Sequence, residues 1–82
     1  MTFFTNLSAD KAAQVRHEGL AAVYVNGVMC CTPSQPVPHA VEIAIECAGD
    51  DWGRFKILPT DLPDGYDYYR IPVAELAAAR IS

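Results

Sequence analysis

Residues 41–47 form a strictly alternating run, and this pattern limits the architecture more than any other part of the chain. In a β-strand successive side chains point to opposite faces, so the run predicts one inward and one outward set. The inward set would be Val41, Ile43, Ile45 and Cys47, and the outward set Glu42, Ala44 and Glu46. Such a strand requires a sheet with one face covered and one face open to water.

A second structural signal is the dipeptide Asn26-Gly27, which lies between two strand-like runs, residues 20–25 and 28–32. This dipeptide favours a two-residue hairpin turn, because both of its residues tolerate a positive φ. The register of such a hairpin predicts an inward set of Val23, Val25, Val28 and Cys30, and an outward set of Tyr24, Met29 and Cys31.

Two more strands are expected after the alternating run. A three-residue loop at Gly49–Asp51 would return the chain as a strand over residues 52–58 and would place Glu46 opposite Arg54. Residues 66–71 are rich in tyrosine and also favour a strand, although either of their faces could be the buried one. The proline-rich segment 33–38 between the hairpin and the alternating run predicts an extended loop.

A helix is expected at each end of the chain. Ser8 can cap the helix that follows it, and Gly19 is well placed to end that helix. Pro72 suits the first turn of a C-terminal helix over Val73–Ile81. Together these elements predict an α+β fold for residues 1–82: one small globular domain with an antiparallel sheet of about five strands and a helix at either end.

The charge is negative and unevenly distributed. Ten acidic and six basic residues give a net charge of −4, and seven of the ten acids lie within residues 42–67. This balance disfavours binding to nucleic acid or to an anionic membrane and favours a basic protein partner, with aromatic side chains as anchors. The predicted partner-binding residues are Glu42, Glu46, Asp50, Asp51, Trp52, Asp61, Asp64, Asp67 and Tyr68. The alternative is a solvated acidic face that only aids solubility.

Signals for catalysis, metal or cofactor binding are weak. The sequence lacks a phosphate-binding glycine loop, a dinucleotide fingerprint and a zinc-protease motif, and neither histidine is linked by spacing to a cysteine or serine. We therefore expect no enzymatic activity, no cofactor and no metal. No apolar run is long enough for a membrane span, and the first residues lack the pattern of a signal peptide, so we expect a location in the bacterial cytoplasm.

The three cysteines are too few for a disulfide scaffold and are expected to be reduced. The predicted hairpin turns Cys31 toward solvent beside Met29 and Tyr24. Such an apolar patch could pair with its own copy, which predicts a homodimer in which two Cys31 thiols can form an intersubunit disulfide under oxidising conditions. An unpaired exposed thiol is the alternative.

The short acidic chain as a whole, with the run 41–47, the segment 49–56 and the Cys30-Cys31 pair, resembles phage-encoded anti-CRISPR proteins that inhibit type I effector complexes, such as those of type I-C. The resemblance implies stoichiometric binding to a Cas subunit, commonly over its DNA-binding surface, so that target DNA is excluded. Two other classes fit the same sequence: a phage or prophage assembly or accessory protein, and an antitoxin-like binder of a basic enzyme.

Overall fold

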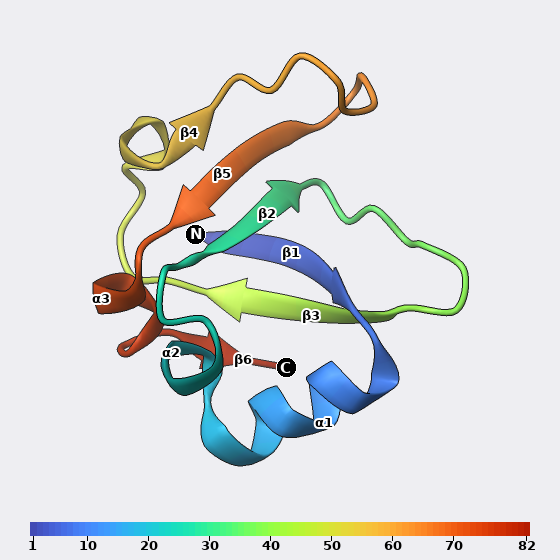
Figure 1. Ribbon diagram of the computed structural model, residues 1–82. Helices are drawn as coiled ribbons and strands as arrows, with labels where there is room; N and C mark the ends of the chain where they lie inside the picture. Colours follow the sequence, from blue (N-terminus) through green and yellow to red (C-terminus); the bar gives the residue numbers. More distant parts are fainter.

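A computed structural model describes all residues from 1 to 82 and shows a six-stranded antiparallel sheet in the order β4-β5-β2-β1-β3-β6 (Figure 1). The elements are β1 (Thr2–Leu7), α1 (Ala9–Glu18), α2 (Leu20–Val23), β2 (Val28–Thr32), β3 (Val41–Glu46), a 3₁₀ turn (Trp52–Arg54), β4 (Lys56–Ile57), β5 (Asp67–Ile71), α3 (Val73–Leu76) and β6 (Arg80–Ile81). The α+β class is confirmed, with six strands where about five were expected.

The N-terminal residues form a central strand that the sequence did not predict. β1 pairs with β3 over its whole length, from Thr2 opposite Glu46 to Leu7 opposite Val41, and meets β2 where Phe4 lies opposite Cys31. Phe3 is fully buried in the hydrophobic core. The strand was missed because Phe3 and Phe4 place large apolar side chains on both of its faces. The alternation of apolar and polar residues that indicates a strand is therefore absent.

The alternating run forms β3 as predicted, with Ile43 and Ile45 fully buried. The predicted hairpin to residues 52–58 is wrong, because β3 lies between β1 and β6, and the short strand β4 pairs with β5 at the opposite edge. Glu46 therefore faces Arg80 across the strands, while Arg54 forms an ion pair with Glu75 at 3.4 Å.

Aromatic packing explains why the chain leaves β3 instead of turning back along it. Trp52 begins a 3₁₀ turn, and its ring centroid lies 5.0 Å from that of Phe3 and 5.7 Å from that of Tyr69. These contacts hold residues 52–55 across the end of the sheet. Burial of a large aromatic side chain stabilises this path of the chain.

The predicted hairpin around Asn26-Gly27 is also wrong. Residues 20–23 form the helix α2, which follows α1 after the break at Gly19, and Leu20 packs into the core. Val25 is exposed instead of buried, although Val28 and Cys30 do face the core as predicted. The Asn26-Gly27 turn thus joins a helix to β2, a connection that local turn chemistry cannot distinguish from a hairpin.

Both predicted helices exist, but only the first has the expected bounds. The Ser8 side chain accepts the Lys11 N–H at 3.2 Å, and α1 ends at Gly19, whose φ is +92°, as the glycine stop predicts. The C-terminal helix ends after Leu76, and the chain continues into β6, where Ala44 and Ser82 exchange two backbone hydrogen bonds. The expected helix through Ile81 is therefore too long, since sheet pairing takes over its last residues.

The buried face of the 66–71 strand, which the sequence left open, is now defined. Tyr69 and Ile71 of β5 belong to the main core, where they meet side chains of α1, α2 and α3. Tyr68 points to the opposite face and is also buried, and its hydroxyl donates to the Pro63 carbonyl at 3.2 Å. The loop between β4 and β5 therefore covers part of the second face of the sheet.

Candidate protein-binding surface

The seven predicted carboxylates lie in several places on the molecule. Glu42 and Glu46 are on β3, Asp50 and Asp51 follow it in a turn, and Asp61, Asp64 and Asp67 lie in or directly after the loop between β4 and β5. Because β2 and β1 separate β5 from β3, the two strands lie about 14 Å apart. Figure 1 shows the chain leaving β3 at the left of the sheet, whereas the β4–β5 loop runs along its top. The fold does not gather the seven into one patch.

Two of the seven carboxylates interact within the chain. The Ser34 hydroxyl lies 2.7 Å from each carboxylate oxygen of Glu42, which is half-buried, so this residue holds the loop after β2 against β3. Asp67 forms an exposed ion pair with Lys56 at 3.3 Å. Of these two interactions, the one at Glu42 is the more structural, because exposed ion pairs contribute little to stability.

The other five carboxylates are exposed and have no basic group within 4.0 Å. We divide them into the turn carboxylates, which are Glu46, Asp50 and Asp51, and the loop carboxylates, which are Asp61 and Asp64. Unpaired exposed carboxylates leave a negative field in solvent, where it can steer a basic partner. These two groups are therefore the part of the predicted surface that remains free to bind.

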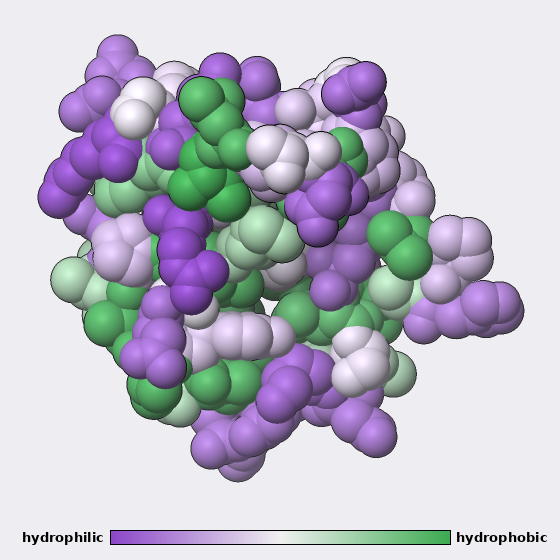
Figure 2. Space-filling view, turned by 45° about the horizontal axis from the view of Figure 1, so that its top comes forward, coloured by the Kyte–Doolittle hydropathy of each residue, from purple (hydrophilic) through white to green (hydrophobic).

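The two predicted aromatic anchors have structural roles. Trp52 is half-buried against Phe3 and Tyr69, and Tyr68 is buried under the β4–β5 loop. Tyr68 presents little surface to a partner, while Trp52 exposes only part of its ring beside the turn carboxylates. The side of the molecule drawn in Figure 2 carries small hydrophobic patches separated by hydrophilic residues, without one broad apolar area.

The predicted dimer contact does not form a continuous exposed patch. Cys31 is only 4% exposed, since the loop after β2 covers it, and its thiol lies 3.7 Å from the Pro33 carbonyl and 3.6 Å from Gln35 Oε1. Met29 is exposed, but Tyr24 follows α2 and packs half-buried against the core. The prediction that Cys31 faces solvent is wrong, because the proline-rich loop folds back over the sheet.

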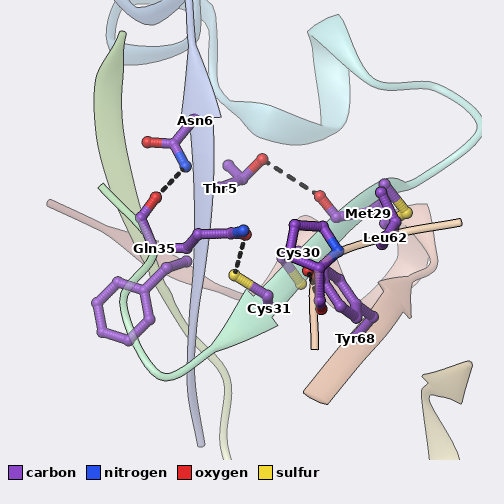
Figure 3. A pocket seen from close by; sticks show the side chains of 10 residues that line it. Thr5, Asn6, Met29, Cys30, Cys31, Gln35, Leu62 and Tyr68 are labelled. Carbon is purple, nitrogen blue, oxygen red and sulfur yellow. Dashed lines mark hydrogen bonds between the residues drawn. The ribbon is translucent and has the colours of Figure 1, made fainter. Parts of the chain in front are cut away.

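A pocket of about 200 Å³ lies beside Cys31, between β1, β2 and the two covering loops (Figure 3). Most of its polar groups are already engaged: Asn6 Nδ2 donates to the Gln35 carbonyl at 2.7 Å, and Thr5 Oγ1 donates to the Met29 carbonyl at 3.2 Å. Asn6 Oδ1 is buried without a partner, and Figure 3 shows it turned away from the pocket. The pocket therefore offers few free polar groups for a ligand.

Burial suppresses the reactivity of the cysteines. It raises the pKa of Cys30 to about 12, with smaller contributions from the nearby Cys31 and Cys47 thiols. Burial is also the main reason that the pKa values of Cys31 and Cys47 are raised. The thiols thus remain protonated at neutral pH, which disfavours a thiolate nucleophile. No group of three or more His, Cys, Asp or Glu side chains lies close enough to hold a metal ion.

Comparison with protein-family models, curated proteins and solved structures gave no match. None of the helices has the length and the apolar character that crossing a membrane would require. The free carboxylates on the surface of this chain are therefore its main feature that indicates a function.

Proposed function

We propose that this protein is a non-enzymatic inhibitor of the anti-CRISPR kind, which binds a basic, DNA-binding subunit of a type I Cas effector complex and excludes target DNA. The observation that best supports the proposal is that all five turn and loop carboxylates are exposed and have no ion-pair partner. Since intramolecular ion pairs do not neutralise them, their full charge is available to a cationic partner.

The positions of the carboxylates support a contact at two points between such an inhibitor and its partner. The turn carboxylates lie at the end of β3 and directly after it, and the loop carboxylates precede β5, so a partner would be contacted at two separated points. A DNA-binding surface carries basic side chains spaced along the path of the phosphates, which suits two separated acidic groups. Each group then contributes to affinity and to the rate of association.

The direct experiment is a pull-down of purified type I effector complexes, with and without target DNA and at two salt concentrations. The test variants are Asp50→Asn with Asp51→Asn, and Asp61→Asn with Asp64→Asn. The matched control is Asp10→Asn with Glu18→Gln, which removes two charges from the exposed side of α1. We expect capture that weakens with salt, that target DNA prevents, and that both test pairs reduce while the control pair does not.

Equal losses from the control and the test pairs would show that only net charge matters and would contradict the proposed surface. Capture that target DNA does not affect would contradict the proposed mechanism. The two other classes have their own signatures: an antitoxin-like protein would capture a basic toxin instead, and an assembly protein would form rings or open-ended oligomers of itself.

A further inference from the structure

The chain is acidic overall, yet three of its six basic side chains line one hollow. This open hollow has a volume of about 420 Å³ and lies beside β4 and the end of β5. Its lining residues are Asn26, Arg54, Phe55, Lys56, Ile57, Arg70 and Pro72. No acidic residue is among them, but Glu75 and Asp67 pair with Arg54 and Lys56 from outside the hollow, so its positive charge comes mainly from Arg70. We call it the basic hollow.

The three cations remain available to an anionic ligand. Arg70 is exposed and has no carboxylate within 4.0 Å. Arg54 and Lys56 do have partners, Glu75 at 3.4 Å and Asp67 at 3.3 Å; both cations and Asp67 are exposed, whereas Glu75 is half-buried. An exposed pair such as Lys56–Asp67 is worth about 0–1 kcal/mol, so an incoming carboxylate can replace Asp67 at little cost. The exposed guanidinium of Arg54 has several N–H donors and can accept a second carboxylate beside Glu75.

The backbone of β4 supplies a second recognition element at the same place. β4 is an edge strand whose only neighbour is β5, and the Arg70 N–H donates to the Phe55 carbonyl at 2.9 Å. Because backbone groups alternate in direction along a strand, the N–H and C=O of Lys56 point away from β5. They are free to pair with an added extended chain, and Leu58, which is 85% exposed, adds an apolar contact just beyond β4.

We propose that the β4 edge and the basic hollow bind an extended acidic segment of a partner protein, which adds as a strand beside Lys56 and places carboxylates near Arg54, Lys56 and Arg70. Charge selects the occupant: two copies of β4 paired with each other would bring like charges together, whereas an acidic strand is attracted. Nucleic acid fits less well, since Phe55, the one aromatic residue of the hollow, is buried and cannot stack on bases.

The test uses a short fluorescein-labelled peptide of Glu-Val repeats, with a Lys-Val peptide and a short oligothymidylate as competing probes, and measures binding by fluorescence anisotropy. We expect the Glu-Val peptide alone to bind, and Arg70→Gln to weaken that binding about three- to tenfold. Arg16→Gln removes an exposed charge from α1 and should leave the affinity unchanged. The folded state of both variants can be verified by near-UV circular dichroism.

Amide hydrogen exchange of the unsubstituted protein tests the strand addition itself. The Lys56 amide should exchange rapidly in the free protein and become protected when the Glu-Val peptide is bound. The proposal would be overturned by the absence of peptide binding at low salt, by equal losses from Arg16→Gln and Arg70→Gln, or by preferential binding of the oligothymidylate. It would also be overturned if the peptide bound while Lys56 stayed unprotected.

Discussion

Gly27 lies directly against Ile71: a Cβ atom built on this glycine would be 2.5 Å from the Ile71 carbonyl oxygen. The φ of Gly27 is +87°, a conformation that residues with a side chain rarely adopt. The Asn26-Gly27 turn therefore requires glycine at its second position. It brings the segment between α2 and β2 close to the end of β5.

Replacement of Gly27 by alanine should destabilise the protein strongly. The strained φ and the contact with the backbone of Ile71 together should lower the free energy of unfolding by about 2–4 kcal/mol. Thermal unfolding measures the effect, and Gly53→Ala is the matched control because nothing lies within 4 Å of a Cβ there. Similar melting temperatures for the two variants would contradict the described packing.

Phe3 and Phe4 are neighbours in the sequence but should respond differently to substitution. Phe3 is fully buried, with ring centroids 5.0 Å from Trp52 and 4.9 Å from Tyr69, whereas Phe4 is half-buried on the other face. Phe3→Leu should loosen Trp52 and shift its fluorescence emission to longer wavelength, while Phe4→Leu should leave the emission unchanged. Equal shifts would show that Trp52 does not pack as described.

The stability of the protein should fall at alkaline pH. Burial raises the pKa of Cys30 from its ordinary value of 9.0 to about 12, so between these values the unfolded chain loses a proton that the folded chain keeps. The resulting stabilisation is complete below pH 9 and is lost toward pH 12, with a limit of about 4 kcal/mol for this thiol. Urea unfolding across this range measures the slope, which Cys30→Ala should reduce. An unchanged slope would contradict this assignment.

The cysteines should react slowly with a thiol reagent while the protein is folded. Cys30, Cys31 and Cys47 are each at most 4% exposed, so the aromatic disulfide reagent DTNB should modify them at a normal rate only after unfolding. Oxidation should likewise produce little disulfide-linked dimer, since Cys31 lies under the loop after β2. Rapid modification of Cys31 in the native protein, or a dimer linked through Cys31 on a non-reducing gel, would contradict its burial under this loop.

The sequence was sufficient to predict the elements that are determined by neighbouring residues. The alternation of β3 and the capping of α1 by Ser8 were predicted correctly, because neighbouring residues determine both. The pairing of β3 was not, since the Trp52 contacts that redirect the chain join residues far apart in the sequence. β1 was missed because the Phe3-Phe4 pair removes the usual alternation.

For the candidate binding surface, the sequence predicted the charge of the residues but not how the fold groups them. Acidity within residues 42–67 is visible in the composition, but the separation of the turn carboxylates from the loop carboxylates depends on strand order. The basic hollow could not be predicted, because Arg70 joins Arg54 and Lys56 only through the pairing of β4 with β5. A residue's charge is therefore readable from sequence, whereas its neighbours are set by the fold.

The most direct test of the proposed inhibition is the dissociation constant for a purified type I effector complex, compared between two four-site variants at low and high salt. One variant neutralises Asp50, Asp51, Asp61 and Asp64; the other keeps those residues and neutralises Asp10, Glu18 and the ion-paired Asp67 and Glu75. We predict that the first variant binds at least about tenfold more weakly at low salt and that the second binds nearly as well as the parent. Equal affinities for the first variant and the parent would contradict the account.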